Sequence, residues 1–325
     1  MKMKRLLACI CIFAMLATTA LLLGSCSKDE SNGKYTVGIC QLTTHPALDS
    51  ATDGFKQALI DKLGEDKLEF DYQNASNQTD VCNTIVNSFV SSKVDLIMAN
   101  ATPALQAAAN ATTTIPILGT SITEYGVALG LTDFNGTVGG NISGTSDLAP
   151  LDDQAQMILD LVPTAKKVGL LYCSAEANSA YQVAVVREYL EAKDIECVDY
   201  KFADSNDVTL VSTQAANECD AIYVPTDNTA AECAETINGA VLPTKTPIIA
   251  GEAGICGNCG IATLSISYYN IGYKTGEMAA KILTGEADIA QMPIEYDTQP
   301  VKQYNPTICE ELGIAAPEGY EALGE

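Results

Sequence analysis

The sequence predicts two similar α/β lobes with parallel, Rossmann-like sheets, joined by a hinge of several strands. Two short apolar runs, 94–99 and 219–224, each stop at a small polar cluster and then pass into an Ala-rich helical pattern. This order is typical of a buried parallel strand that feeds a helix. Ligands of open α/β sheets lie at the carboxyl ends of such strands, so these two ends indicate where a binding site belongs.

Matched strand ends indicate that the two lobes arose by duplication. Segment 35–40 matches 167–172, with Gly38 and Gly169 separated by 131 residues (169 − 38), and 115–121 matches 246–252 at the same offset (252 − 121). With the runs 94–99 and 219–224 aligned, at an offset of 125 residues (219 − 94), Thr102 corresponds to Asp227. At the offset of 131, Ser121 corresponds to Glu252. We therefore expect these four residues at the facing edges of the two sheets.

In the first lobe, strands and helices alternate along the chain. We expect strands at 35–42, 68–72, 94–99 and 115–119, and helices at 49–63, 79–92 and 104–111. Phe55, Leu59 and Leu63 recur at helical spacing in the first helix. Thr102 and Pro103 are typical of an N-cap followed by proline in the first helical position.

The second lobe repeats the scheme after a glycine-rich stretch at 124–144. The motif 146–150 is expected to begin a helix that runs to 162 and is capped by Ser146 or Asp147. Strands follow at 168–172, 196–200, 221–224 and 247–250, and helices at 179–193, 208–217 and 228–240. Strands that alternate with helices predict right-handed βαβ units and a parallel sheet.

The last 70 residues extend beyond the duplication. They show a strand at 262–267, a helix at 270–283, a strand-like run at 293–296 and a short helix at 309–312. The simplest explanation is that the chain crosses back to the first lobe and finally returns to the second. We therefore predict an N-terminal lobe of 35–143 plus 253–294, and a C-terminal lobe of 144–252 plus 295–325. Several crossings make a hinge, and a hinge between two lobes makes a cleft that can close.

The N-terminus predicts export. A basic start, an apolar run at 6–23 and the ending Leu-Gly-Ser-Cys at 23–26 resemble a lipoprotein signal peptide of residues 1–25. Cys26 would then carry lipid and anchor the chain outside the cytoplasm, to the bacterial cell membrane. Residues 26–34 are a polar tether. An ordinary cleaved signal or a membrane anchor is the alternative.

The charge excludes two classes of partner. The chain has 18 Lys and Arg against 41 Asp and Glu, and removal of residues 1–25 takes away Lys2, Lys4 and Arg5 but no acid. The net charge of the remainder is therefore 15 − 41, or −26. Nucleic acid requires clustered basic residues, so no nucleic-acid partner is expected. Such an acidic surface also disfavours lying flat on an anionic bilayer.

The cysteines predict neither a metal site nor redox catalysis. Of 12 cysteines, two lie in the signal and one is Cys26, which leaves nine. An odd number leaves at least one unpaired within the chain, and the pairing stays open. Cys256 and Cys259 form a lone C-x-x-C flanked by glycines, for which a local disulfide or two free thiols is the expected state.

No motif of an enzyme or of a cofactor site is present, so we expect a non-enzymatic protein without a cofactor. His45 is the single histidine and lies at a strand-to-helix turn. Ligand contact or loop capping is favoured there over catalysis. No phosphate-binding glycine motif occurs. A hydrolase that uses His45 or a cysteine remains the alternative.

A binding cleft is better supported. Helix N-termini with hydroxyl or amide residues favour a carboxylate, and the acids Asp227 and Glu252 suit an ammonium group. Together they describe a zwitterion, that is, an amino acid. Asp227 is alternatively a helix N-cap. The candidate ligand contacts are Gln41, Thr43, His45, Thr102, Ser121, Asn178, Ser179, Asp227, Asn228 and Glu252. Four tyrosines are candidate flat walls: Tyr125, Tyr172, Tyr268 and Tyr269.

Seven short motifs in order resemble one family. They are His45-Pro-Ala-Leu-Asp49, Asp71-Tyr-Gln-Asn-Ala75, Ala101-Thr-Pro-Ala104, Ser146-Asp-Leu-Ala-Pro150, Glu176-Ala-Asn-Ser179, Tyr223-Val-Pro-Thr-Asp-Asn-Thr229 and Ala250-Gly-Glu252. Over residues 35–295 the chain resembles ABC-transporter substrate-binding lipoproteins of the tryptophan/tyrosine-binding type. The resemblance implies a type I periplasmic-binding-protein fold. It also implies delivery of a small ligand, an aromatic amino acid, to an ABC permease and its ATPase. The loops at Thr102, Asn178/Ser179, Asp227/Asn228 and Glu252 are the implied contacts.

Two segments depart from the family pattern. Thr123-Glu-Tyr125 stands where the family has Thr-Asp-Pro, and Cys-Gly-Asn-Cys-Gly follows Glu252 in place of a charged loop. The first departure bears on which side chain is accepted. Two further hypotheses are a sensor of the same fold that contacts a membrane receptor, and an importer component for a ligand other than an amino acid.

Overall fold

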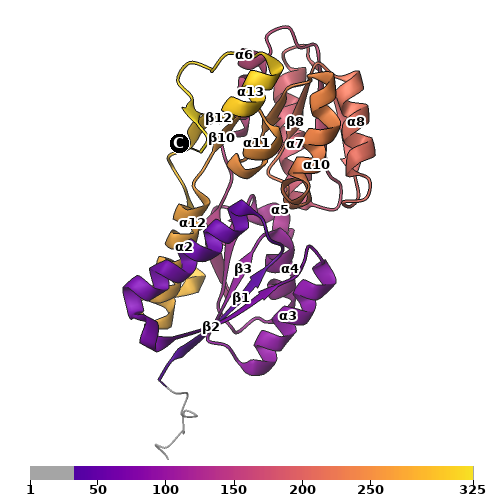
Figure 1. Ribbon diagram of the computed structural model, residues 1–325. Helices are drawn as coiled ribbons and strands as arrows, with labels where there is room; N and C mark the ends of the chain where they lie inside the picture. Colours follow the sequence, from indigo (N-terminus) through magenta and orange to yellow (C-terminus); the bar gives the residue numbers. More distant parts are fainter. Residues whose placement is uncertain (1–32, 325) are drawn as a thin grey trace, which may run out of the picture. The chain divides into compact units, whose positions relative to one another are not determined.

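The computed structural model describes residues 33–324. Two lobes are visible, each a sheet with helices packed against it (Figure 1). The predicted fold class is confirmed. The predicted signal peptide at 1–25 and nearly all of the tether at 26–34 lie outside the described residues. No helix among those described is both long and apolar enough to cross a membrane.

The N-terminal lobe has a six-stranded sheet in the order β11-β5-β4-β3-β1-β2, and every pairing in it is parallel. The strands are β1 (Tyr35–Gln41), β2 (Leu68–Asn74), β3 (Leu96–Asn100), β4 (Ile117–Ile122), β5 (Ile142–Ser146) and β11 (Glu295–Tyr296). The helices are α2 (Pro46–Leu63), α3 (Thr79–Ser92), α4 (Thr102–Ala111), α5 (Tyr125–Leu129) and α12 (Tyr268–Leu283). Two apolar clusters form its core.

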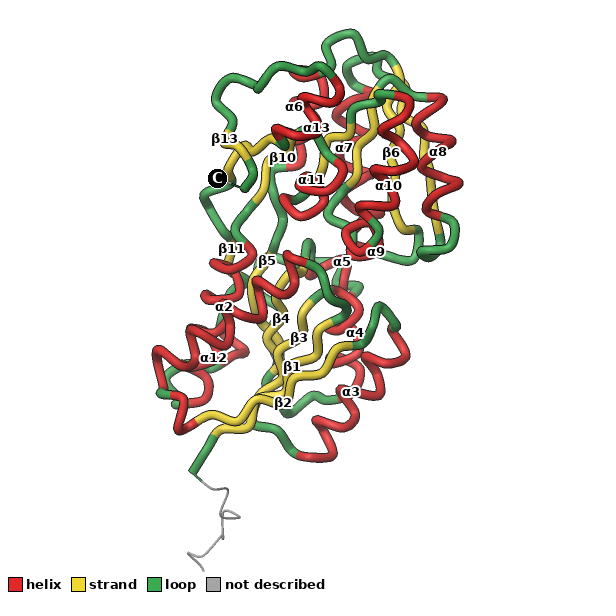
Figure 2. The backbone as a smooth tube through the Cα atoms, viewed as in Figure 1, coloured by secondary structure: helices red, strands yellow, loops and turns green. Residues whose placement is uncertain are grey.

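Glycines allow α12 to pack directly against α2 (Figure 2). A Cβ atom on Gly54 would lie 2.2 Å from the Tyr269 carbonyl oxygen, and one on Gly272 would lie 2.0 Å from the Ala51 carbonyl oxygen. Both distances are far below van der Waals contact, so only glycine permits this approach. The packing fixes α12, and with it Tyr268 at its first turn, against the lobe that contains β1.

The C-terminal lobe has a seven-stranded sheet in the order β13-β12-β10-β9-β8-β6-β7. The strands are β6 (Lys167–Cys173), β7 (Glu196–Phe202), β8 (Ala221–Val224), β9 (Ile248–Ala250), β10 (Ala262–Ser265), β12 (Val301–Tyr304) and β13 (Glu321–Ala322). The helices are α6 (Leu151–Leu161), α7 (Ala177–Glu191), α8 (Val208–Glu218), α9 (Asn228–Glu232), α10 (Ala234–Val241), α11 (Ala253–Cys259) and α13 (Pro306–Leu312). The order β7-β6-β8-β9-β10 repeats the order β2-β1-β3-β4-β5, as a duplication requires. Only β12 runs antiparallel to its neighbour, β10.

The lobe boundaries lie later in the chain than predicted. β5 extends the first sheet to Ser146, so the first crossing follows residue 146 and not 143. β10 belongs to the second sheet, so the chain leaves that lobe between β10 and α12 and not at 253. β11 pairs with β5, so the last crossing falls between β11 and β12 and not at 295. β5 and β10 are corresponding strands, but their sequences share too little to reveal this additional pair.

Several predicted element boundaries are also wrong. Ser146 ends β5, and α6 begins only at Leu151 after Pro150, which makes no side-chain cap. Thr102 is already helical, and the N-cap is Ala101 with a φ of 90°. The helix expected at 228–240 is two helices that meet at Cys233. The glycine-rich stretch at 124–144 includes α5.

Candidate functional site

The carboxyl ends of the strands in both lobes face a narrow enclosed space, here called the inner cavity. It includes six of the ten predicted ligand contacts: His45, Ser121, Asn178, Asp227, Asn228 and Glu252. Residues of both lobes line it, as the predicted facing sheet edges require. Its volume is about 10 Å³, room for about one water molecule. A larger ligand therefore requires the residues of the two lobes that line the inner cavity to lie farther apart than they do here.

The other four predicted contacts lie outside the lining of the inner cavity. Gln41 is fully buried, and its Nε2 donates to the Thr43 carbonyl at 2.7 Å and to Asp49 at 2.6 Å. It therefore holds the loop that carries His45. Ser179 is buried and lies beside Asn178, whose Nδ2 approaches its Oγ at 3.3 Å. Thr102 is buried in the first turn of α4.

Four buried polar atoms that line the inner cavity have no hydrogen-bond partner in the described structure. They are His45 Nδ1, Ser121 Oγ, Asp147 Oδ1 and Asn178 Oδ1. Unsatisfied buried polar atoms are rare in proteins because each one costs about 1–3 kcal/mol. Four of them around one small space indicate a place built to hydrogen-bond a ligand.

Ser121 has a strained backbone. Its φ is 56°, and the β4–β5 register shifts between Gly119 and Ile122. Such an irregularity redirects the side chain at a strand end. Non-glycine residues in the left-handed region occur where the surroundings impose that conformation, often at functional sites. Here it places the unpartnered Ser121 hydroxyl beside the inner cavity.

Asp147 is the acid that the sequence reasoning missed. It follows β5 directly, and the Tyr268 hydroxyl donates to its Oδ2 at 3.0 Å. Burial raises the pKa of Asp147 to about 6, although the bond from Tyr268 opposes this change. The motif that contains Asp147 resembles the start of a helix, so the sequence did not indicate that Asp147 lies at the end of a strand. The sequence signal for this site is an acidic residue directly after a strand, β5, that consists mainly of small and polar residues.

Asp227 and Glu252 act as helix caps. Asp227 accepts from the backbone N–H of Cys173 and of Ala230, each at 2.7 Å. Glu252 accepts from the N–H of Gly254 at 2.6 Å and of Ile255 at 2.5 Å. Both carboxylates therefore already bind backbone donors at helix N-termini, and the alternative of Asp227 as an N-cap is confirmed. Burial raises the pKa of both groups, as does the nearby Glu176 for Asp227.

Glu176 organises the loop opposite His45. Its carboxylate accepts from the backbone N–H of Asn228 at 3.0 Å and of Thr229 at 2.9 Å, and also from both of their side chains. The Asn228 amide nitrogen is thus engaged, and its oxygen faces the other lobe, where His45 Nε2 lies 3.3 Å away. Because that oxygen can only accept, Nε2 is the donor of this bond between lobes.

Only one of the four predicted tyrosine walls belongs to the inner cavity. Tyr268 lines it. Tyr125 is buried beneath β5, where its hydroxyl donates to the Thr145 carbonyl at 3.1 Å. Tyr172 packs in the core of the C-terminal lobe, and Tyr269 is 41% exposed.

The C-x-x-C segment is helical, not a loop. Cys256 and Cys259 are buried in α11, and their thiols are free, as are those of the other seven cysteines in the described range. Burial raises the pKa of both thiols well above the ordinary value, which disfavours the thiolate. Within residues 33–324 no group of three or more potential ligands could hold a metal ion.

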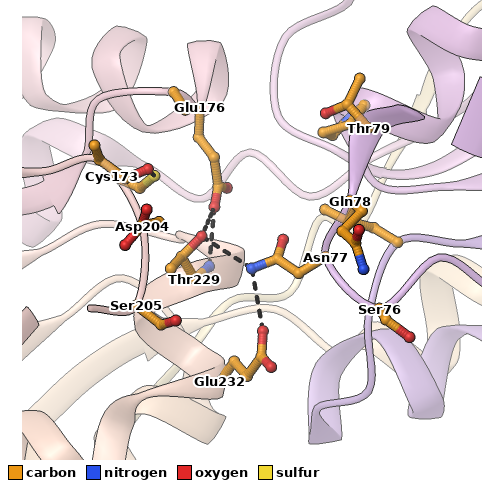
Figure 3. Close-up of a pocket in the computed structure, with 14 residues that line it drawn as sticks. Ser76, Asn77, Gln78, Thr79, Cys173, Glu176, Asp204, Ser205, Thr229 and Glu232 are labelled. Carbon is orange, nitrogen blue, oxygen red and sulfur yellow. Dashed lines mark hydrogen bonds between the residues drawn. The ribbon is translucent and has the colours of Figure 1, made fainter. Parts of the chain in front are cut away.

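A second, more open space, here called the outer cavity, lies at the edge of the interlobe contact (Figure 3). Its volume is about 280 Å³. Asn77 reaches it from the N-terminal lobe, and Thr229 and Glu232 of α9 reach it from the C-terminal lobe. Helix α9 separates the two spaces, because Asn228 and Ala231 line the inner cavity while Thr229 and Glu232 line the outer one.

Comparison with known proteins places the chain among transport proteins. A family model described as ABC transporter substrate binding protein matches residues 36–323. A tyrosine-binding protein of Clostridioides difficile is 37% identical over 269 residues, which cover 82% of this chain and 77% of that protein.

Two solved structures of similar proteins match nearly the whole of this fold. One is an ABC domain in complex with L-Trp from Streptococcus pneumoniae, with a TM-score of 0.85 at 29% identity, covering 89% of this chain and all of that one. The other is the ligand-free, open structure of a substrate-binding protein with adhesive properties from Clostridium difficile. Its TM-score is 0.68 at 35% identity, with 89% of this chain and 99% of that one covered. The TM-score is thus higher for the L-Trp complex than for the open structure, despite the lower sequence identity.

Proposed function

The chain belongs to the family of ABC transporter substrate-binding proteins, and from this premise we propose that it binds an aromatic amino acid between its lobes. The ligand is then delivered to an ABC permease and its ATPase without chemical change. Cys26 carries the lipid that keeps the protein at the outer side of the cell membrane.

The observation that carries the proposal is the set of four unpartnered polar atoms around the inner cavity. They include two acceptors, Asp147 Oδ1 and Asn178 Oδ1, and one hydroxyl, that of Ser121. The Asn178 oxygen is identified as an acceptor because its Nδ2 donates to Glu176 at 3.2 Å and to the Thr226 carbonyl at 3.2 Å. The inner cavity thus offers hydrogen-bonding groups of both kinds within one small space.

An amino acid satisfies these groups. Its ammonium group donates to Asp147 and Asn178, and an ionised partner makes such a bond about twice as strong as a neutral one. Its carboxylate accepts from the Ser121 hydroxyl. His45 Nδ1 accepts from the ligand while the ring is neutral and donates when the ring is protonated. The predicted zwitterion is retained, but the ammonium partner is Asp147, since Asp227 and Glu252 already cap helices.

An aromatic side chain is favoured by the relatives and by the lining. A tyrosine-binding protein is 37% identical to this chain, and a structure in complex with L-Trp is 29% identical. Tyr268, Leu48 and Ala231 give the inner cavity apolar surface. A flat ring stacks against a tyrosine at 4.5–7 Å between ring centres and gains about 0.5–1.5 kcal/mol beyond its burial.

Thermal unfolding of the purified protein against the twenty amino acids, with sugars and nucleosides alongside, tests this proposal. A ligand at 100 times its Kd adds about 2.7 kcal/mol of stability. We expect tyrosine, tryptophan or phenylalanine to raise the melting temperature and the other compounds to leave it unchanged. Stabilisation by a sugar or nucleoside alone would overturn the amino-acid assignment while keeping the family.

A further inference from the structure

We propose that Asn77 is a positioning residue for ligand retention: it holds the lobes closed from the outer cavity without touching the ligand. The ligand in this inference is the one in the proposed function, on which the inference rests. The contact between the lobes does not depend on that function. Asn77 lies in the turn between β2 and α3 of the N-terminal lobe. Its side chain points across the lobe boundary toward α9 (Figure 3).

The contacts of Asn77 join the two lobes. Its Nδ2 donates to Glu232 Oε2 at 3.1 Å and to Thr229 Oγ1 at 3.2 Å. Thr43, from the loop that leads to His45, donates to the same Glu232 oxygen at 3.4 Å. Because each bond joins groups of different lobes, it exists only while the lobes are together. Such contacts shift the equilibrium toward the closed form, since a group bonded in one state alone stabilises that state.

The backbone at Asn77 is shaped for this role. Ser76 and Asn77 are consecutive left-handed residues, with φ values of 51° and 59°. The turn is fixed on both sides, because Ser76 N–H donates to Asn74 Oδ1 and Asn77 N–H donates to the Leu42 carbonyl, each at 2.8 Å. Non-glycine residues in the left-handed region persist where the surroundings impose that conformation. Asparagine tolerates this conformation and also supplies the donor that glycine lacks.

Helix α9 links this contact to the ligand. Thr229 and Glu232 face Asn77, while Asn228 and Ala231 of the same short helix line the inner cavity. Asn228 also bonds His45 of the opposite lobe. The outer contact therefore holds the same helix that closes the inner cavity.

Three variants separate this role from a structural one. In Asn77→Gly the side chain is lost but the left-handed turn is kept, so we expect an unchanged melting temperature and about threefold to tenfold faster ligand dissociation. In Asn77→Asp two carboxylates face each other, and we expect dissociation about tenfold faster or more. In Asn77→Asp combined with Glu232→Gln, the donor and acceptor are exchanged, so dissociation should return to near the wild-type rate.

Stopped-flow dissociation of L-tyrosine and L-tryptophan, with small-angle X-ray scattering of the ligand-free proteins, gives the two readouts. We expect a larger radius of gyration for Asn77→Asp than for wild type, and its reversal in the double variant. Equal dissociation rates in wild type and both single variants, or no rescue in the double variant, would overturn the inference. If neither amino acid binds, the proposed function has failed. The small-angle scattering then remains as the test, and equal radii of gyration for all four proteins would overturn the inference.

Discussion

Replacement of Asp147 by asparagine should make the protein more stable and its ligand binding weaker. Burial raises the pKa of this carboxyl from 3.8 to about 6. The folded state therefore holds the proton more tightly than the unfolded state, so this carboxyl lowers the stability progressively as the pH rises from 3.8 to 6 and by its full amount above pH 6. The difference corresponds to about 3 kcal/mol, which Asp147→Asn should recover at pH 7. Near pH 4 the carboxyl is protonated in the folded state, and most of the advantage should disappear.

Asparagine keeps the shape and still accepts from the Tyr268 hydroxyl, but it removes the charge and replaces the second acceptor oxygen by an NH2 donor. Loss of the charged partner for the ammonium group should weaken amino-acid binding about tenfold to hundredfold, since such a bond contributes about 1.5–3 kcal/mol. Denaturant unfolding at pH 4 and pH 7 and calorimetric titration measure the two effects. Asp133→Asn, which neutralises an exposed acid, is the control and should change neither. A variant that is less stable at pH 7 and binds as wild type would refute this reasoning.

Four further outcomes are expected. In wild type, the affinity for the amino acid should fall about tenfold from pH 7 to pH 5, because Asp147 takes up its proton near pH 6. Titration calorimetry measures this change, and a constant affinity across the range would contradict the account. Tyr268→Phe removes the donor to Asp147 and should weaken binding about fivefold; unchanged affinity would exclude that role. Glu252→Ala removes the α11 cap and should lower the free energy of unfolding by about 1–2 kcal/mol, which denaturant curves would reveal. Cys26→Ser should release the protein from the membrane fraction, and retention there would count against the lipid anchor.

The general plan of the fold was predictable from the sequence because apolar strands and helical spacing recur in the same order in both halves. The helix α3 and the strand β8 have the predicted limits. The lobe boundaries were not predictable, since β5 and β10 correspond in space but not in sequence. Their pairing partners, β11 and β12, are short strands that only the assembled sheets define.

The candidate site was predictable in part. Strand ends followed by small polar residues led to Ser121, Asp227 and Glu252, all of which line the inner cavity. Their individual roles were not evident, because capping depends on which backbone N–H groups lie within reach of a carboxylate. Asp147 was missed because the segment that contains it resembles a helix start. Asn77 was missed because its partners belong to the other lobe.

Calorimetric titration with L-tyrosine and two analogues tests the central claim most directly. Tyramine lacks the carboxylate, and 3-(4-hydroxyphenyl)propionate lacks the ammonium group. L-tryptophan and 3-(indol-3-yl)propionate form the matching pair for the other named ligand. The account predicts that the intact amino acid binds and that each analogue binds at least tenfold more weakly. It also predicts that Asp147→Asn reduces the penalty for losing the ammonium group more than the penalty for losing the carboxylate. Equal affinity for an amino acid and its analogue without the ammonium group would contradict the account.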